Sequence, residues 1–584
     1  MANMFAIRNG RWNDPEMWST GVVPTSTDVV GLNGFIVFIH NTTIEASRIT
    51  METTTGTSVD GYLSTGYDPA TDYYGDGTAN ALWNNTPWFG VEEFHSYLKG
   101  DNNVVINAEI SCKIRFSGLS MRGAIPQPLN LTVNGDITPT SGIANLIYFQ
   151  HPSDMAAGRW IRTGWKEVIN ITINGNVTNL GTSALLISML YGRFSGSFVV
   201  NGDVSIGNTS GYGMFIGSTY DFVLSNFLIK ITGTFIAPNS TSSTVGSMIL
   251  TGYGSASIEI GSIINQTLNS SQCQTIHVNG FGDLSITIGS IQSLYKDSLI
   301  NYFGTKFHGR LKLHILSSVT MVQNTSLNGT IISANNTNAS LSPRTEIIID
   351  GSFTFSKKAP ISISTSSQNK EILIHIKGDL IGTAISAPAF FINATSNRQG
   401  VILLVDGNLN LNSFGIQLYS GPISDLKYLQ IGGTLMYGTS TTGFGASSPG
   451  PSIPISGKIR KIRPNKIQGS VIRGIVPLAR VSVEEIDNYT NLNNFIAING
   501  PITVDEKVRM VMKGPGNSKL VFVKGGDAAS ATVQPEDLFA GVSYGATTGT
   551  ASDVLPQYYI KGISGTLGEG TVGTEVYTRN LLGT

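Results

Sequence analysis

Residues 131–137 read LTVNGDI, and the same pattern returns as ITINGNV at 171–177, FVVNGDV at 198–204, IIIDGSF at 347–353 and LLVDGNL at 403–409. Each copy alternates apolar and variable positions, then has a small residue, a variable residue and a last apolar one. Such alternation is typical of a β-strand with one buried face. The pattern predicts a strand followed by a bend, where we expect glycine to adopt a positive φ.

The spacing of the copies predicts how they are arranged. From VVINAEI at Val104 to IPISGKI at Ile453, successive copies start 24 to 40 residues apart and mostly about 28. A second apolar stretch, such as YGMFIG near Met214, follows most copies. This period, without helical periodicity, predicts an all-β fold, a parallel β-helix with about 28 residues per rung. A β-sandwich needs no fixed spacing, and a propeller blade needs about 40–50 residues.

A solenoid of this kind should stack equivalent residues of successive rungs in its core. We therefore expect Val405 to point inward between Ile376 and Ile431.

Composition excludes several classes of protein. Only 13% of the 584 residues are charged and the net charge is −1, which argues against a coiled coil and against a nucleic-acid binder. The two cysteines, Cys112 and Cys273, form no disulfide framework and lack metal-ligand spacing. The first residues lack the apolar stretch of a secretory signal, and no run of apolar residues is long enough to insert in a membrane. No P-loop, zinc or Ser/His/Asp signature is present, so we expect no cofactor, no metal and no catalytic residues of these types.

Changes in amino-acid composition and repeat pattern along the chain predict five parts. They are an N-terminal cap with the first coils (1–50), an aromatic-rich insertion (51–103), the parallel β-helix (104–459), a basic connector with a small β domain (460–525) and an extended Gly-rich assembly tail (526–584). Two tryptophans and rigid prolines in the first part suit a cap over the open end of a solenoid.

Two segments resemble bacteriophage proteins. The first is carried by Gly10, Trp12, Pro15, Trp18, Gly21, Pro24 and Asp28 and is similar to the beginning of the β-helix in phage tail and fibre proteins and in bacterial surface proteins. The second resembles P-x-D-V-x-x-G-x-x-Y-G-x-x-T-G-T of phage tail and fibre proteins, and it is carried by Pro535, Asp537, Gly541, Tyr544, Gly545, Thr548, Gly549 and Thr550. Leu538 replaces the usual Val, and the first segment covers under a tenth of the chain.

The resemblance implies a structural virion protein of the tail-fibre or tailspike type. We expect a tail-fibre, spike or head-decoration subunit that is made in the host cytoplasm and acts in particle assembly, host-surface attachment or both. Its partners would be copies of itself in a homotrimer, other virion proteins and a host surface glycan. We expect no enzymatic activity. Two alternatives stay open: a tailspike enzyme that cleaves a bacterial polysaccharide, and a bacterial surface adhesin.

Aromatic residues indicate where a glycan would bind. All six tryptophans lie before residue 166, within or beside Gly-, Asn- and Asp-rich segments that we expect to be loops. Aromatic faces pack against the C–H faces of sugars, and nearby polar groups bond the hydroxyls. The candidate glycan-binding residues are Tyr73, Tyr74, Trp83, Trp88, Trp160 and Trp165. The alternative is that these aromatics pack against the cap or a neighbouring subunit.

Two further sets of polar residues have a structural interpretation. Asp350, Asp379 and Asp406 recur near the rung spacing and could stack in one column, yet Asp beside Gly is also the expected turn residue, so we favour turns over catalysis. The sequons at Asn41, Asn130, Asn170 and Asn393 suit amide ladders between stacked coils better than glycosylation.

Overall fold

The fold is taken from a computed structural model of the chain. The structure describes residues 3–39, 41–59, 61–64, 102–116, 128–138, 147–149, 167–179, 187–189, 193–206, 214–217, 223–237, 246–251, 253–265, 274–279, 283–292, 300–304, 310–321, 332–336, 344–355, 361–365, 371–382, 390–394, 399–410, 416–420, 424–437, 445–446, 456–464, 480–488, 495–499, 502–503, 507–512, 519–523, 543–544, 547–548, 557–561 and 566–567. The chain divides into two compact units, residues 1–289 and 290–584, which are described separately.

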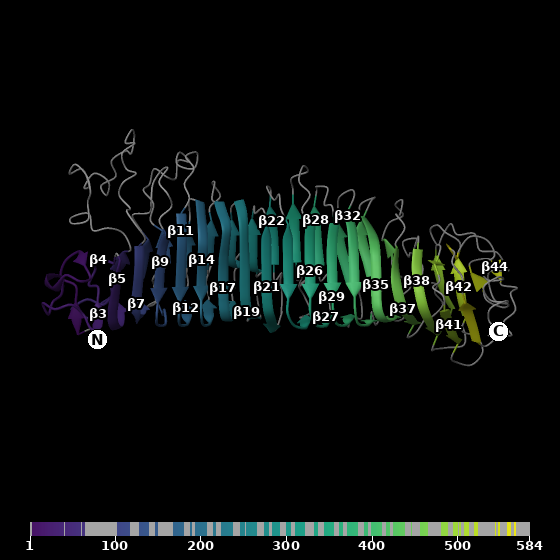
Figure 1. Cartoon of the computed structure of the whole chain (residues 1–584), viewed down its shortest axis with the longest axis horizontal. Coiled ribbons are helices and arrows are strands. Elements are labelled where there is room, and N and C mark those ends of the chain that lie inside the picture. The colour runs from purple at the N-terminus through teal and green to yellow at the C-terminus, as the bar shows by residue number, and fades with distance from the viewer. Residues whose placement is uncertain are drawn as a thin grey trace, which may run out of the picture. The chain divides into compact units, whose positions relative to one another are not determined.

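The first unit is a parallel β-solenoid, with about 28 residues per turn as predicted (Figure 1). Its long strands each pair in parallel with the next: β1 (Met4–Phe5), β3 (Val29–Gly31), β5 (Thr42–Thr50), β7 (Asn102–Ser111), β9 (Pro128–Val133), β11 (Glu167–Ile173), β14 (Arg193–Val200), β17 (Val223–Ala237) and β19 (Tyr253–Asn265). Beyond the bend, β12 (Val177–Asn179) pairs with β15 (Val204–Ile206), and β15 pairs with the end of β17.

The second apolar stretch of each repeat forms a separate sheet in this unit. Its strands are β2 (Gly10–Arg11), β4 (Ile36–Phe38), β6 (Tyr62–Ser64), β8 (Lys113–Phe116), β10 (Ile147–Phe149), β13 (Ile187–Met189), β16 (Met214–Gly217), β18 (Gly246–Thr251) and β20 (Gln274–Asn279). The predicted stretch near Met214 is β16, which pairs in parallel with β18.

The second unit repeats this architecture, and β21 (Leu284–Gln292) spans the boundary in the chain. Its long strands are β23 (Leu311–Ile315), β26 (Arg344–Ile349), β29 (Glu371–Ile376), β32 (Gln399–Val405), β35 (Ser424–Tyr437), β37 (Ser456–Pro464) and β38 (Arg480–Asn488). Short strands follow the bends: β24 (Val319–Met321), β27 (Phe353–Phe355), β30 (Leu380–Gly382) and β33 (Leu409–Asn410). The other sheet holds β22 (Ile300–Gly304), β25 (Ile332–Asn336), β28 (Ile361–Thr365), β31 (Phe390–Ala394), β34 (Ile416–Ser420) and β36 (Gly445–Ala446).

The register of the coils confirms the predicted stacking. Val405 lies opposite Ile376 on one side and Ile431 on the other, and all three side chains are buried. Leu131 likewise lies opposite Ile171, 40 residues later in the chain, so the longest predicted interval is one coil with an insertion. Burial of each Val, Leu or Ile side chain stabilises the fold by about 1.5–3 kcal/mol. Because the side chains stack from coil to coil, they form one continuous apolar core along each unit.

The glycines at the bends are needed for a reason other than the predicted one. None of the described glycines at the bends of the repeated pattern has a positive φ. Other described glycines, such as Gly196 and Gly254, do have one. A Cβ on Gly135 would instead lie 2.2 Å from the carbonyl oxygen of Ala108, and one on Gly175 would lie 2.4 Å from that of Gly135. The prediction of a left-handed bend was wrong, because glycine is required here by the close approach of successive coils.

The last predicted copy was also out of register. The pattern at Ile453 places Ile453 opposite Leu429, whereas the structure places Gly457 there. Parallel pairing also starts before residue 104, at β1, and continues beyond residue 459 through β38 to β40 (Ile502–Thr503) and β41 (Lys507–Met512).

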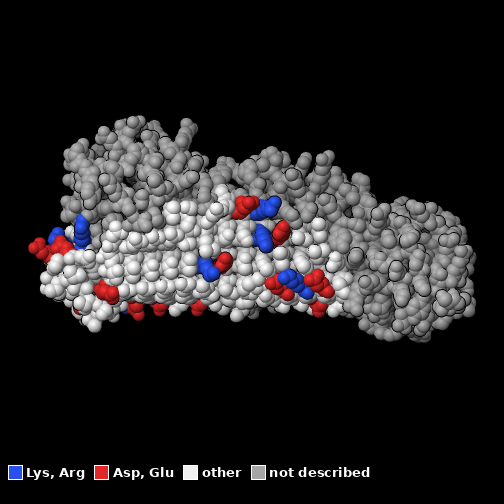
Figure 2. Space-filling view, viewed as in Figure 1, with Lys and Arg blue, Asp and Glu red and all other residues white. Residues whose placement is uncertain are grey.

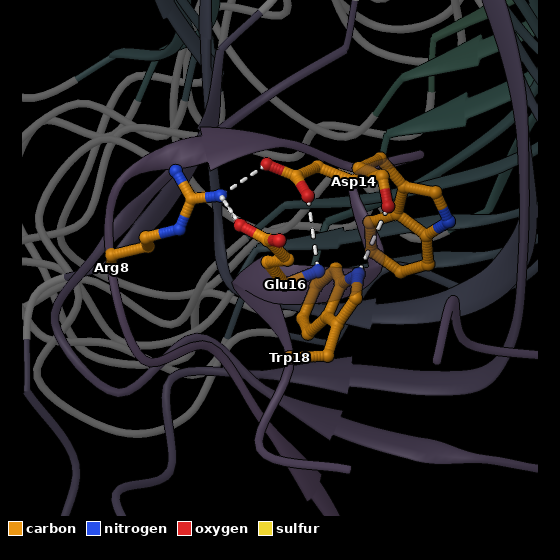
Figure 3. Close-up of polar contacts among 5 residues, drawn as sticks. Arg8, Asp14, Glu16 and Trp18 are labelled. Atoms are coloured by element: carbon orange, nitrogen blue, oxygen red, sulfur yellow. Dashed lines mark hydrogen bonds and ion pairs between the residues drawn. The ribbon is translucent and has the colours of Figure 1, made fainter. Parts of the chain in front are cut away.

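The two tryptophans of the predicted cap are buried at the first coil, beside the polar contacts of Arg8, Asp14 and Glu16 (Figure 3). Trp12 and Trp18 are buried with their ring centroids 5.0 Å apart at 70°, and Trp18 Nε1 donates to the Trp12 carbonyl at 2.9 Å. Trp18 forms an antiparallel bridge with Ala6, which covers the edge of β1. Arg8 pairs with Asp14 and lies 3.8 Å from Glu16, around the helical turn η1 (Pro15–Met17) that leads into Trp18. Covering an edge strand in this way prevents further pairing along it.

Strands of the predicted tail pair with the chain itself. β45 (Gln557–Lys561) is antiparallel to β41, and β46 (Thr566–Leu567) is antiparallel to β40. Smaller pairs are the parallel β39 (Phe495–Asn499) with β42 (Lys519–Val523) and the antiparallel β43 (Ser543–Tyr544) with β44 (Thr547–Thr548). Within the predicted tail, the strands β43 to β46 therefore pair within their own chain, whereas β39 and β42 precede it.

Candidate functional site

The outer face of the first unit carries two columns of amide side chains. Along one column, Asn134 donates from Nδ2 to Asn107 Oδ1 at 2.7 Å, Asn174 donates to Asn134 at 2.7 Å and Asn201 donates to Asn174 at 2.8 Å. The parallel column links Asn130 to Asn103 at 2.7 Å and Asn170 to Asn130 at 2.9 Å. We call the first column the Asn-Gly ladder, because glycine follows Asn134, Asn174 and Asn201.

These ladders account for the sequons. Asn130 and Asn170 belong to the second column, and Asn41 Oδ1 accepts the backbone N–H of Asn103 at 2.8 Å. The structural interpretation is confirmed for these three residues. The side chain of Asn393, in β31, lies outside the described residues.

The residue after each bend glycine forms another link between coils. Asp136 Oδ1 accepts the backbone N–H of Asn176 at 2.7 Å, Asn176 Oδ1 accepts that of Asp203 at 2.9 Å, and Asp203 Oδ1 accepts that of Thr234 at 2.7 Å. This arrangement explains why Asp, Asn, Ser or Thr follows the glycine. Each of these side chains has an oxygen that can accept a hydrogen bond from a backbone N–H of the next coil.

The second unit holds a cluster of ionisable side chains, which we call the ionic cluster: His314, Asp350, His375, Lys377 and Asp406. They come from β23, β26, β29 and β32 or from the residues just after these strands. His314 Nε2 is 3.0 Å from Asp350 Oδ2, Lys377 Nζ is 2.7 Å from Asp350 Oδ1, and His375 Nε2 is 3.0 Å from Asp406 Oδ2. Figure 2 shows that the Lys and Arg side chains on the visible face of the described part stand beside Asp or Glu.

Asp350 is the most constrained member of the ionic cluster. Lys377, and then His314, hold the pKa of its carboxyl below its usual range. His314 Nε2 and Asp350 Oδ1 are covered from solvent, at ion-pair distances from their partners but without the angles of directed hydrogen bonds. An ionised, paired carboxylate suits an electrostatic or proton-accepting role, whereas a general acid needs a raised pKa.

The predicted column of three aspartates was wrong. Asp350 precedes Gly351 and Asp406 precedes Gly407, but Asp379 follows Gly378. The residue stacked between Asp350 and Asp406 is therefore Lys377, as the pairing of Ile349, Ile376 and Val405 requires. Asp379 lies in the column of backbone acceptors, where its Oδ1 accepts the N–H of Asn408 at 2.6 Å. Asp379 therefore links successive coils, a structural contact different from the local turn that the sequence suggested.

Around His375 of the ionic cluster lies an outward-facing group of aliphatic side chains, which we call the aliphatic face: Ile348, Leu373, Ile402 and Leu404. Ile348 and Leu404 are the register partners of His375 in the two neighbouring coils. All four are half-buried, and Leu373 lies directly opposite Ile402. The equivalent outward positions in the first unit are mixed: Asn170, Thr172 and Ser197 lie beside Val199 and Lys230. The signal in the sequence is the near-continuous apolar run of EIII, EILIHI and VILLV, which is typical of strands apolar on both faces.

All six predicted glycan-binding residues, Tyr73, Tyr74, Trp83, Trp88, Trp160 and Trp165, lie outside the described residues. Their role stays a prediction. The buried thiol of Cys112 has its pKa raised to about 12 by burial, so it stays protonated and is no nucleophile at neutral pH.

Across the described ranges, no group of three or more His, Cys, Asp or Glu side chains is placed to hold a metal ion. The same part of the chain contains no helix long and apolar enough to cross a membrane. No family model, no curated protein and no solved structure matches the chain.

Proposed function

We propose that this chain is a structural virion protein of a bacteriophage, a tail-fibre, spike or head-decoration subunit that acts in particle assembly and host-surface attachment. The observation that carries the proposal is the way each coil is joined to the next. Backbone pairing, a stacked apolar core and side-chain ladders all act between the same coils. Such redundancy suits a stiff scaffold, and the resemblance at residues 535–550 supplies the phage context.

The polar groups of the described outer faces support a scaffold role over a catalytic one. Ladder amides bond to one another, and the acids after the bend glycines accept backbone N–H groups of the next coil. Groups engaged in this way stabilise coils and are not free to act on a substrate. In this proposal the chain has no enzymatic activity of its own.

The aliphatic face supports self-association. Aliphatic side chains on the outside of a parallel sheet are normally covered, and a centre of this kind with a polar rim is the usual anatomy of an interface. The rim charges pair within the chain, as Asp350 does with Lys377, so the covering surface needs no countercharge. An identical, near-neutral face meets that requirement. We therefore propose that copies of this chain cover it, in the homotrimer that the resemblance implies.

Light scattering on the purified chain tests this proposal. We expect the mass of an oligomer for the wild type and the mass of one chain for the double variant Leu373→Lys with Ile402→Lys. The matched control places lysines at Thr172 and Val199, outward-facing residues of the first unit, and should stay oligomeric. A monomeric wild type, or dissociation of the control alone, would contradict the proposed interface.

The location in a virion needs a separate test. Antibodies against the chain should label purified phage particles, and the particles should contain other virion proteins in contact with it. A chain found only free in the lysate of the infected host would contradict the virion assignment, whatever its oligomeric state.

The second candidate function is a polysaccharide-cleaving tailspike. The ionic cluster favours it, because His375 paired with Asp406 is an arrangement that can accept a proton. Incubation with bacterial surface polysaccharides, followed by an assay for new chain ends, tests it. Cleavage that His375→Ala abolishes, while leaving the thermal melting unchanged, would establish the enzyme and displace the purely structural proposal.

A further inference from the structure

Three rungs of the first unit carry the sequence Asn-Gly at the same bend. They are Asn134–Gly135, Asn174–Gly175 and Asn201–Gly202, and the three asparagine side chains are exposed to solvent. Asn-Gly is chemically labile because glycine lacks a Cβ, so its backbone nitrogen can approach the carbonyl carbon of the preceding amide unhindered. Three labile pairs in register are a feature that the proposed scaffold role does not by itself require.

Neither residue of these pairs can be exchanged without cost. A Cβ on Gly135, Gly175 or Gly202 would come within 2.2–2.4 Å of a carbonyl oxygen in the preceding coil. The asparagines form the Asn-Gly ladder, in which Asn134 and Asn174 both donate and accept and Asn201 donates to Asn174. A carboxylate at this position could accept a hydrogen bond but could not donate one to the next amide.

The same contacts hold the reacting groups apart. The backbone N–H groups of Asn134, Asn174 and Asn201 donate to carbonyls of the preceding coil at 2.7, 2.7 and 2.8 Å. Their side-chain amides are held by the ladder at similar distances. The glycines have no room to move toward the preceding coil. Ring closure needs the side-chain amide carbon to rotate onto the glycine nitrogen, which breaks the ladder hydrogen bond of that side chain.

We propose that Asn134, Asn174 and Asn201 are latent deamidation sites, which the Asn-Gly ladder protects while the first unit is folded. In the reaction, the backbone nitrogen of the glycine attacks the side-chain amide carbon of the preceding asparagine, and ammonia leaves, forming a five-membered imide. Water then opens the imide at one of its two carbonyls and yields aspartate or isoaspartate. No oxidant, metal or enzyme is required.

Modification would propagate along the ladder. A new carboxylate at position 174 could no longer donate to Asn134, and two such carboxylates in neighbouring coils would repel one another across a strand spacing of about 4.8 Å. Loss of one link loosens the adjacent amides, which then react more readily. The rate of deamidation at each of these asparagines therefore depends on whether the neighbouring ladder hydrogen bonds are intact.

Mass spectrometry of peptides from aged protein tests the proposal. The wild-type chain is incubated at neutral pH, folded in buffer and unfolded in urea, and deamidation is quantified at each asparagine. Because at least one ladder hydrogen bond must open first, we expect the three sites to react at least roughly tenfold more slowly in the folded protein. Equal rates in the two conditions would overturn the proposal.

A pair of variants separates the ladder from folding in general. Asn107→Ala removes the acceptor of Asn134 and should speed deamidation at position 134 roughly fivefold, with no change at position 201. The matched control, Asn103→Ala, shortens the neighbouring column on the same strand, where Asn130 is followed by Leu131. An equal effect of both variants at position 134, or no effect of Asn107→Ala, would show that the ladder gives no protection.

Discussion

The replacement Val405→Asp probes the stacked core of the second unit most sharply. Val405 is fully buried between Ile376 and Ile431 in successive coils. The change removes about 1.5–3 kcal/mol of apolar burial and leaves a carboxyl group without a partner, which costs about 1–3 kcal/mol more. We expect the free energy of unfolding of these coils to fall by about 3–5 kcal/mol.

Urea unfolding followed by circular dichroism measures this loss, and hydrogen exchange at the amides of residues 371–405 localises it. Val199→Asp is the matched control, because Val199 faces outward between Thr172 and Lys230 and its carboxylate would stay in water. The control should change stability by less than about 1 kcal/mol. If Val405→Asp unfolds at the same urea concentration as the control and the wild type, the assignment of Val405 to the core is wrong.

Three further predictions follow from the coils, the ionic cluster and the aromatic residues. Gly175→Ala should cost about 3 kcal/mol, because its Cβ meets backbone of the preceding coil, whereas Gly56→Ala, at φ +76° in open space, should cost about 1 kcal/mol; equal losses in urea unfolding would contradict the steric explanation. Asp350 has a lowered pKa, so its ionised form stabilises the fold above about pH 4, and this contribution disappears as the pH falls below that value. Thermal melting of Asp350→Asn should therefore decline less between pH 5 and 2 than that of the wild type, and parallel curves would refute the pairing. Replacing Trp160 and Trp165 with Ala should abolish binding to host cells without lowering the melting temperature if they hold a glycan; a lowered melting temperature or failed assembly would assign them a structural role instead.

Much of the fold could be predicted from local sequence. Strands with one buried face show alternating apolar residues, and the close contact between coils requires a glycine at most bends. The copies starting at Leu131, Ile171 and Phe198 pair in the predicted order. The copy at Ile453 failed because its glycine, Gly457, satisfies the pattern while the coil pairs four residues away from the predicted register. A regular template cannot detect such a slip when neighbouring residues are also apolar or small.

The ionic cluster was missed for a related reason. Counting acids at the rung spacing grouped Asp379 with Asp350 and Asp406, although one follows its glycine and the others precede theirs. In the structure Ile349, Ile376 and Val405 are register partners, so the residues that follow them share one column. Lys377 therefore lies between Asp350 and Asp406, and negative and positive charges alternate along the column. Which side chains meet across coils depends on register to a single residue, and spacing alone does not give that.

The most direct test of the proposed structural role is to determine, in intact particles by cross-linking and electron cryomicroscopy, which chains surround this one. The account predicts copies of the chain against one another, with the aliphatic face of Ile348, Leu373, Ile402 and Leu404 covered, and other virion proteins in contact with the assembly. A chain that stands alone in the particle with this face open to solvent, or that is absent from the particle, would contradict it.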